Sequence, residues 1–339
     1  MFKRLFTSVL VITFSLLSVL TSADAVWKGT LNPLDKRTVP IFMDANWNAC
    51  STGFLYAPRI VFTVAHAAYF GDDRVEEQTL LRPTIWVGWP IDTLNTVSSS
   101  NPTGTRRIAS EKIFIADGYK DRDYFRGGNR ISRINDFAVI VLPKPLPVDD
   151  KKVILLTPEL HQQYIDSGEQ INLTGYGSQN ASDVEKTCDE RKPSSFQSAM
   201  VGKTLGALGN GITWTETLNF KVQPGMPNLC NGDSGSPYTK ILSDSYVYLG
   251  AASSSFNQHN CESFPPALSK ESINGADPVY LFKDLIAKAE KYVADNPYIA
   301  PKAANSATKK KTTINCIKGK ATTKVSGVNP KCPVGYTKR

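Results

Sequence analysis

The stretch Asn231-Gly-Asp-Ser-Gly-Ser-Pro237, preceded by Cys230, decides how the rest of this sequence is interpreted. Glycine on both sides of Asp233 and Ser234 permits a sharp turn that leaves the Ser234 hydroxyl exposed. The same turn would point the N–H groups of Gly232 and Ser234 at one position, where an oxyanion could form. The tetrapeptide alone fits an ordinary turn equally well, because Gly, Asp and Ser are common turn residues. A nucleophile is predicted only if the chain also supplies a base and an orienting acid.

Both groups are found at the ends of apolar segments. His66 lies in Phe62-Thr-Val-Ala-His-Ala67, directly after an apolar strand. Asp136 begins the apolar part of Asn135-Asp-Phe-Ala-Val-Ile-Val-Leu142, so its carboxylate can be buried against an imidazole. A rigid scaffold delivers residues at strand ends to a cleft. The sequence therefore predicts a base, an acid and a nucleophile in the chain order His66, Asp136, Ser234.

Between residues 26 and 296 the sequence predicts an all-β fold. Short β-type runs alternate with Gly, Pro, Asn and Asp, and there is neither an αβ alternation nor a repeat. Pro143–Lys152 is interpreted as a connector between two halves of similar size. Helical periodicity occurs between Pro278 and Asn296 and predicts a helix that closes the β core. The predicted strands are Arg59–Val64, Thr84–Gly88, Ile113–Ala116, Phe137–Leu142, Gln170–Thr174, Ala199–Leu205, Leu218–Val222, Tyr238–Leu242 and Tyr246–Ala252.

The two ends of the chain differ from this β-rich part. Residues 1–25 combine a basic start, an apolar run and the small-x-small sequence Ala23-Asp-Ala25, which predicts a signal peptide and a secreted mature chain beginning at Val26. A membrane anchor is disfavoured because the apolar run is short for a bilayer span, and we expect no transmembrane span after signal removal. Residues 297–313 are interpreted as a linker. Residues 314–339 are predicted to form a small tail closed by a disulfide.

The net charge of +8 arises from this tail. Residues 302–339 contain ten Lys or Arg residues and no Asp or Glu. The part between the signal peptide and the tail is therefore mildly acidic, and nucleic-acid binding loses its main support. The tail could hold the protein to anionic cell-surface polymers or lipids, although a charge run is usually a solvated face.

The segments around the three residues resemble motifs of the trypsin/chymotrypsin family of serine proteases, in its secreted bacterial form. T-V-A-H-A is similar to that family's T-A-A-H-C, N-D-F-A-V-I-V-L to N-D-I-A-L-I-x-L, and C-N-G-D-S-G-S-P to C-x-G-D-S-G-G-P. Leu173–Gly177 and Asp277–Tyr280 also match. The resemblance implies two six-stranded antiparallel β-barrels packed against each other, at about residues 26–145 and 150–283. It also implies a C-terminal helix at about 279–295.

The resemblance further implies a secreted serine endopeptidase that acts on polypeptides as a monomer without a cofactor. Ser234 would be the nucleophile, His66 its general base and Asp136 the acid that orients His66. The N–H groups of Gly232 and Ser234 would bind the oxyanion. Two alternatives remain open at this point. One is a serine esterase that uses the same site, and the other is a non-catalytic surface-binding protein on the same fold.

Asp233 and the cysteines acquire roles through the same resemblance. In this family the acid before the nucleophile pairs with a new N-terminal ammonium group. Signal cleavage would expose Val26, so an Asp233–Val26 ion pair and no separate zymogen step are expected. The resemblance pairs the cysteine beside the nucleophile with one across the specificity pocket. The expected disulfides are Cys230–Cys261, Cys50–Cys188 and Cys316–Cys332.

The predicted specificity pocket carries no charge. By the family's spacing, Asn228 lies on its floor, Ser253, Ser254 and Ser255 form its wall, and Pro278 replaces a common glycine. No carboxylate is present to bind Arg or Lys, so basic side chains are not expected to be favoured. Ser253 is also expected to donate a hydrogen bond to Asp136.

Two further groups are predicted to have no chemical role. An acidic cluster follows His66 and could hold Ca²⁺ through oxygen ligands, but a solvated loop is the stronger expectation, and no metal site is predicted. The two histidines that are not part of a motif are expected on the surface. These residues are Asp72, Asp73, Glu76 and Glu77 for the cluster, and His161 and His259 for the histidines.

Overall fold

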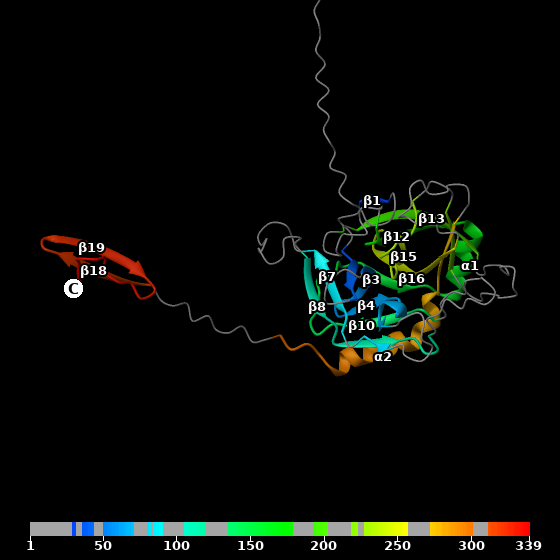
Figure 1. The fold of residues 1–339 in the computed structure, drawn as a ribbon, viewed down its shortest axis with the longest axis horizontal. Coiled ribbons are helices and arrows are strands. Elements are labelled where there is room, and N and C mark those ends of the chain that lie inside the picture. Colours follow the sequence, from blue (N-terminus) through cyan, green and yellow to red (C-terminus); the bar gives the residue numbers. More distant parts are fainter. Residues whose placement is uncertain are drawn as a thin grey trace, which may run out of the picture. The chain divides into compact units, whose positions relative to one another are not determined.

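The structure, a computed structural model of the 339-residue chain, describes residues 29–31, 36–43, 50–70, 80–82, 84–90, 105–119, 135–178, 191, 193–202, 218–222, 227–256, 272–300 and 311–339. The chain divides into two compact units, Met1–Asn296 and Pro297–Arg339. Figure 1 shows that the larger unit is built mainly from strands, which confirms the predicted all-β class. No helix among the described residues is both long and apolar enough to span a membrane.

The first half of the larger unit is a curved sheet of seven antiparallel strands, in the order β8-β7-β2-β3-β4-β10-β9. The two end strands follow each other in the chain, separated only by Ser110 and Glu111, so the sheet bends round into a barrel-like shape. Its inner side chains, among them Ile41, Val61 and Ile140, are fully buried. The strands are β2 (Thr38–Phe42), β3 (Cys50–Ala57), β4 (Ile60–Thr63), β7 (Trp86–Pro90), β8 (Thr105–Ala109), β9 (Lys112–Ile115) and β10 (Ala138–Val141), and the short β5 (Tyr69–Phe70) pairs with β6 (Leu80–Leu81).

The second half is a closed antiparallel barrel of six strands, as predicted. Its order is β13-β12-β15-β16-β17-β14, and β14 pairs back with β13. Two short strands extend it: β1 pairs with β13, and β11 runs parallel to β16. The strands are β1 (Thr30–Leu31), β11 (Lys152–Leu155), β12 (Gln170–Gly175), β13 (Ser194–Gly202), β14 (Leu218–Val222), β15 (Pro237–Ile241), β16 (Ser245–Phe256) and β17 (Ser272–Ala276).

The two halves pack against each other through aromatic side chains. The ring of Tyr248 from β16 lies 4.8 Å from that of Phe54 on β3 and 5.2 Å from that of Phe62 on β4, measured between centroids. Phe137, just before β10, stacks on Phe282 at 4.6 Å. All five rings are buried. The segment that precedes the predicted base and the segment that follows the predicted acid are therefore anchored in the core.

One helix was not predicted. Helix α1 (Pro158–Ser167) begins after Thr157, whose hydroxyl caps the first turn, and ends at Gly168, which has a φ of 61°. His161 lies on its buried side, and its Nδ1 is 3.1 Å from the hydroxyl of Tyr280. The predicted surface position of His161 is therefore wrong, because the helix turns this side chain into the interior.

The helix predicted near the end of the larger unit is confirmed. A 3₁₀ turn, η4 (Val279–Phe282), leads directly into α2 (Lys283–Asp295). Leu285, Ile286 and Ala289 of α2 are buried, as the periodicity of the sequence predicts. The helix therefore covers one side of the β core.

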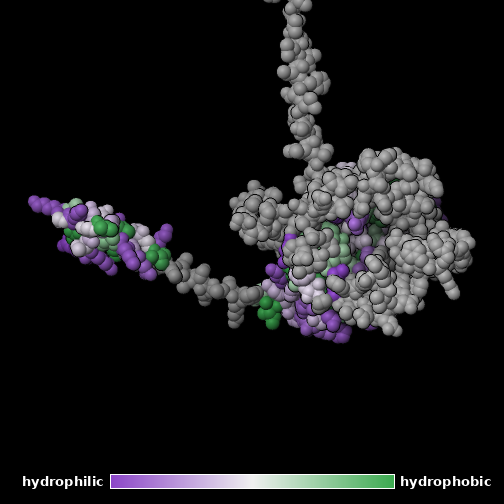
Figure 2. Space-filling model, viewed as in Figure 1, coloured by the Kyte–Doolittle hydropathy of each residue, from purple (hydrophilic) through white to green (hydrophobic). Residues whose placement is uncertain are grey.

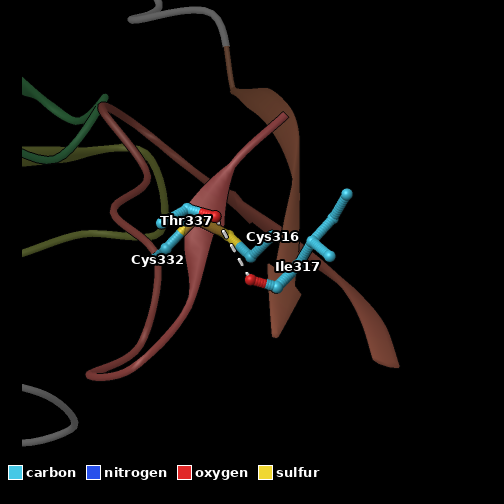
Figure 3. The surroundings of a disulfide bond; sticks show 4 residues. All are labelled: Cys316, Ile317, Cys332 and Thr337. Atoms are coloured by element: carbon cyan, nitrogen blue, oxygen red, sulfur yellow. Dashed lines mark hydrogen bonds between the residues drawn. A yellow bond between two sulfur atoms is a disulfide. The ribbon is translucent and has the colours of Figure 1, made fainter. Parts of the chain in front are cut away.

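The smaller unit is a three-stranded sheet with a disulfide. Strand β18 (Thr312–Lys318) lies between β19 (Ala321–Gly327) and β20 (Thr337–Lys338). The predicted bond between Cys316 and Cys332 is present, next to a hydrogen bond from the Thr337 hydroxyl to the carbonyl of Ile317 (Figure 3). Figure 2 shows hydrophilic residues interspersed with several hydrophobic ones on the surface of this unit. With so small an apolar core, the disulfide has a large share in holding the three strands together.

Candidate active site

His66 and Asp136 are brought together by the pairing of two strands. His66 lies in a 3₁₀ turn (Ala65–Ala67) after β4, and Asp136 lies just before β10. Because Thr63 of β4 pairs with Ala138 of β10, the end of one strand lies beside the start of the other. Oδ2 of Asp136 is 2.7 Å from Nδ1 of His66, and Oδ1 accepts the backbone N–H of His66 at 2.9 Å. A carboxylate accepts hydrogen bonds, so this contact directs a proton to Nδ1 and makes Nε2 the acceptor nitrogen of the ring.

The carboxylate of Asp136 is surrounded by further groups that fix it. Ser253 donates its hydroxyl to Oδ2 at 2.5 Å, as expected from the sequence. The backbone N–H of Asp136 donates to Oδ2 of Asp277 at 2.9 Å. Burial raises the pKa of Asp277 to about 6, and the nearby charge of Asp136 adds to this effect. Sequence reasoning used Asp277 only as part of a motif and did not find this contact.

The backbone just before Asp136 adopts a conformation that few residues tolerate. Asn135 has a φ of 53°, in the left-handed region, and its side-chain amide donates to the carbonyl of Asp117 at 2.8 Å. Asparagine adopts this conformation more readily than most residues. The Asn-Asp pair of the motif thus sets the direction of the backbone at Asp136, just before β10 begins.

The predicted sharp bends around Ser234 are two successive type II turns. In the first, the N–H of Asp233 donates to the carbonyl of Cys230 at 3.0 Å, and Gly232 has a φ of 97°. In the second, Ser236 donates to Asp233 at 2.9 Å, and Gly235 has a φ of 84°. A type II turn needs a positive φ at its third residue, which glycine adopts without strain. Ser234 therefore lies at a corner, half-buried.

The loop that carries Ser234 is held by residues of the first barrel. The carbonyl of Ser234 accepts the N–H of Thr52 at 2.7 Å and the hydroxyl of Ser51 at 2.6 Å. The Thr52 hydroxyl donates to the carbonyl of Gly232 at 3.0 Å and accepts the N–H of Tyr176 at 3.0 Å. The site therefore lies on the seam between the two barrels.

Strand β16 connects this loop to the acid. Gly235 donates its N–H to the carbonyl of Ala252 at 2.7 Å, and Ala252 donates to Ser236 at 2.8 Å. The next residue, Ser253, binds Asp136. Gly235 also packs closely against the end of β4, because a Cβ added to Gly235 would lie only 2.4 Å from the hydroxyl of Thr63. The three predicted residues are thus carried by neighbouring backbone segments.

Within the described residues, neither the N–H of Gly232 nor that of Ser234 donates a hydrogen bond. Two backbone N–H groups at one turn are the donors that an oxyanion requires. The geometry therefore leaves both groups able to bind a ligand oxygen.

Asp233 points away from this turn into a closed site of the second barrel. Its Oδ1 accepts the N–H of Gly177 at 2.7 Å, and its Oδ2 accepts the N–H of Cys230 at 2.9 Å. A Cβ added to Gly175 or Gly177 would lie 2.1 or 2.3 Å from the carboxylate oxygens, so only glycine fits at both positions. Burial raises the pKa of Asp233 to about 7, although these two N–H groups and the charge of Arg191 lower it.

Arg191 is a residue that sequence reasoning missed. It is buried, and its Nη1 donates to the carbonyls of Asn231 at 3.2 Å and Tyr176 at 3.4 Å. Its Nη1 would lie 2.6 Å from a Cβ added to Gly232. It follows a stretch of charged residues that resembles a solvated loop, and no motif marks it.

The predicted floor of the specificity pocket is neutral. Asn228 accepts the side-chain N–H of Asn274 on β17 at 2.8 Å through its Oδ1. Asn274 is fully buried and was not predicted. Ser254 and Ser255 lie in β16, with side chains outside the described set, and Pro278 is buried at the start of η4.

Several predictions lie outside the described residues: Val26, Cys188, Cys261, His259 and the acidic cluster at residues 72–77. Cys50 and Cys230 both form disulfides, and their partners lie outside the described residues. The predicted pairings of Cys50 and Cys230, and the Val26–Asp233 ion pair, stay predictions. Among the described residues, no group of three His, Cys, Asp or Glu side chains could hold a metal ion.

A comparison with protein-family models identifies the family of this chain. The model of the family described as Trypsin matches residues 36–265, about two thirds of the chain. No curated protein matches this sequence. The matched span contains His66, Asp136 and Ser234.

Proposed function

The chain belongs to the trypsin family of serine peptidases, and on that premise we propose that it is a secreted endopeptidase in which Ser234, His66 and Asp136 form the catalytic triad. The observation that carries the proposal is the pair of hydrogen bonds that the Asp136 carboxylate accepts from the ring and from the backbone N–H of His66. This contact fixes both the position and the tautomer of the imidazole. Asp136 orients His66 and stabilises its charged form, and it does not itself need to take up the proton.

In the proposed reaction, Oγ of Ser234 attacks the carbonyl carbon of a peptide bond while Nε2 of His66 takes the hydroxyl proton. The tetrahedral intermediate carries its negative charge on the former carbonyl oxygen. The N–H groups of Gly232 and Ser234 would bind that oxygen. The C–N bond then breaks, and His66 gives its proton to the leaving amine, which leaves an ester on Ser234.

A water molecule then attacks this ester, with His66 again acting as base. Collapse of the second tetrahedral intermediate breaks the bond between the acyl carbon and Oγ of Ser234. The proton on His66 then returns to this Oγ. The imidazolium that forms in both halves lies against the Asp136 carboxylate, which is buried and hydrogen-bonded to Ser253. An ion pair in such a site is stronger than in water, which favours the transition state in which charge develops.

We propose that the specificity pocket selects side chains without a positive charge. Asn228 is neutral, and its Oδ1 is already engaged by Asn274. A Lys or Arg side chain would lose its hydration there without gaining a counter-charge, which is costly in a buried site. Neutral side chains do not meet this cost.

Export and surface retention are further parts of the proposal. Residues 1–25 would be removed as a signal peptide, and the disulfides of Cys50, Cys230 and Cys316 fit an oxidising compartment. The tail would bind an anionic cell-surface polymer. Exposed Lys320, Lys324 and Lys331 in the smaller unit support this role.

The function is tested with the mature protein, a fluorophosphonate probe and casein. The wild type should be labelled and should cleave casein, whereas Ser234→Ala should do neither. Ser243→Ala, in the exposed turn between β15 and β16, is the matched control and should behave as the wild type. Labelling without proteolysis would favour a serine esterase, and absence of labelling in the folded wild type would favour a binding protein.

A further inference from the structure

The peptide unit between Asn231 and Gly232 has a fixed orientation. The carbonyl oxygen of Asn231 accepts the buried N–H of Ser178 at 2.8 Å and Nη1 of Arg191 at 3.2 Å. In a trans peptide the carbonyl and the N–H point in opposite directions. The N–H of Gly232 therefore points away from the N–H of Ser178 and from Nη1 of Arg191. A flipped peptide would lose both hydrogen bonds and would withdraw this N–H from the site.

Arg191 contacts both segments that enclose Asp233. Besides Asn231, its Nη1 reaches the carbonyl of Tyr176 at 3.4 Å, next to Gly177, whose N–H binds Asp233. Arg191 is 8% exposed and Asp233 is 1% exposed. The fork of a guanidinium group can hold several acceptors in one plane, which suits this position.

The charge of Arg191 also acts on Asp233. A carboxylate buried this deeply is ionised at little cost only if a positive charge lies close by. Arg191 lowers the pKa of Asp233 against the stronger effect of burial. The other titratable group that faces the carboxylate is the hydroxyl of Tyr238 on β15, whose own pKa is raised by burial and by Asp233, so it stays neutral. Among the described residues, Arg191 is the cation that acts on Asp233.

We propose that Arg191 is a positioning residue that holds the Asn231–Gly232 peptide in its oxyanion-binding orientation and provides a buried positive charge at the turn that carries Asp233. The enzyme would then be competent without a free ammonium group at Val26. This inference rests on the proposed peptidase function, and it names a different partner for Asp233 from the one expected by resemblance.

The test compares N-terminal forms with substitutions at Arg191. The protein is prepared beginning at Val26, and also with two extra residues ahead of Val26. Each form carries Arg191, Arg191→Met or Arg191→Lys. The readouts are the rate of fluorophosphonate labelling and kcat and KM for a neutral chromogenic peptide. Arg59→Met, which removes another buried arginine whose partners include Leu142 and Glu111, controls for general loss of stability.

If the proposal holds, the extended form labels within about twofold of the form that begins at Val26. Arg191→Met lowers kcat and the labelling rate in both forms by about 100-fold, with little change in KM, because one oxyanion donor is lost. Arg191→Lys recovers part of the loss, and Arg59→Met keeps the wild-type kcat. A large loss in the extended form, with full activity in Arg191→Met, would overturn the proposal in favour of the Val26 ammonium group.

A second measurement does not depend on catalysis. In the inactive Ser234→Ala background, the Asp233 carboxyl is titrated by ¹³C NMR with Arg191 and with Arg191→Met, after thermal unfolding has shown that both are folded. The pKa of Asp233 should rise when Arg191 is replaced. An unchanged pKa would overturn the proposal even if the protein proved not to be a peptidase. Absence of labelling in the wild type would overturn the peptidase function alone.

Discussion

Asp277 and Asp136 are joined by a single hydrogen bond, from the backbone N–H of Asp136 to Oδ2 of Asp277 at 2.9 Å. One carboxylate thus positions the segment that carries another. The arrangement brings two acidic groups close together, and this proximity adds to the burial that raises the pKa of Asp277 to about 6. We infer that Asp277 contributes to the site by holding the backbone of Asp136 in place.

Replacing Asp277 should separate the role of its oxygen from the role of its charge. Asp277→Ala leaves the buried N–H of Asp136 without its acceptor, and kcat/KM should fall about tenfold or more. Asp277→Asn keeps an acceptor oxygen and should stay within about threefold of the wild type. The measurement is steady-state hydrolysis of a neutral chromogenic peptide. Equal losses in both variants would show that the charge, and not the hydrogen bond, matters.

Stability should decrease as the pH rises from 4 to 7. The pKa values of Asp233 and Asp277 are about 7 and about 6 in the folded protein, against 3.8 ordinarily. Between these values the folded state holds protons that the unfolded state has lost, so each group favours folding at low pH and loses this effect as the pH passes its folded pKa.

Thermal unfolding of inactive Ser234→Ala across this pH range gives the measurement. The double variant Ser234→Ala, Asp277→Asn should show a shallower decrease in Tm below about pH 6, because one of the two groups no longer titrates. Parallel Tm curves for the two proteins would mean that the carboxyl of Asp277 does not hold its proton as described.

Substitution at Gly177 should reduce activity more than stability alone explains. A Cβ at this position would meet the Asp233 carboxylate at 2.3 Å, so Gly177→Ala must displace Asp233 and the turn that follows. Gly168→Ala is the matched control, because Gly168 has a φ of 61° but no atom near the added Cβ. Strain there costs about 1–2 kcal/mol without touching the site.

Both variants are compared by Tm and by kcat. Gly168→Ala should lower Tm and keep kcat, whereas Gly177→Ala should lower kcat at least tenfold at temperatures where it is fully folded. If kcat in Gly177→Ala were unchanged, the contact between Gly177 and Asp233 would have no part in shaping the turn.

Asn228→Asp should change the preferred substrates. The hydrogen bond from Asn274 can be kept by a carboxylate oxygen, so the substitution adds a charge with little loss of structure. Peptides with Lys or Arg before the cleaved bond should gain at least tenfold in kcat/KM, while Asn228→Ala should give no such gain. Profiling a peptide library with the three proteins provides the measurement. A wild type that already cleaves only after Lys or Arg would contradict the assignment of Asn228.

The basic tail should act separately from the site. Deletion of residues 302–339 should leave kcat/KM unchanged and abolish sedimentation with an anionic polymer such as teichoic acid. A full-length variant with Lys320, Lys324 and Lys331 replaced by Gln keeps the disulfide and should also lose most of the binding. Retained binding in this variant would assign the interaction to a surface other than these lysines.

The sequence was sufficient to predict the strands beside His66 and Asp136, because an apolar run precedes His66 and another follows Asp136. It also predicted the bends at Ser234, because the glycines on both sides of the Asp233-Ser234 pair allow the backbone to turn sharply. Strands β2 and β3 were missed because buried Thr, Ser and Pro residues lie within them and a buried Arg precedes β2. These residues interrupt the alternation of apolar and polar side chains that indicates a strand. Helix α1 was missed because it is short and presents only His161 and Tyr164 to the interior.

The contacts around Asp233 could not be predicted, for a different reason. Gly175 and Gly177 were recognisable only as part of a motif, and their use, making room for a carboxylate that follows more than fifty residues later, depends on tertiary structure. Arg191 gives no local signal at all. Charged residues are usually exposed, and only the fold shows that this one is enclosed.

Thr52 belongs to β3 of the first barrel, yet its backbone and hydroxyl hold Gly232, Ser234 and Tyr176 of the second. The turn that carries Ser234, the proposed nucleophile, thus keeps its shape only while the two barrels are joined. Separation of the two barrels would abolish activity before either barrel unfolded. A newly synthesised chain could therefore not cut its surroundings until its last half had assembled on its first.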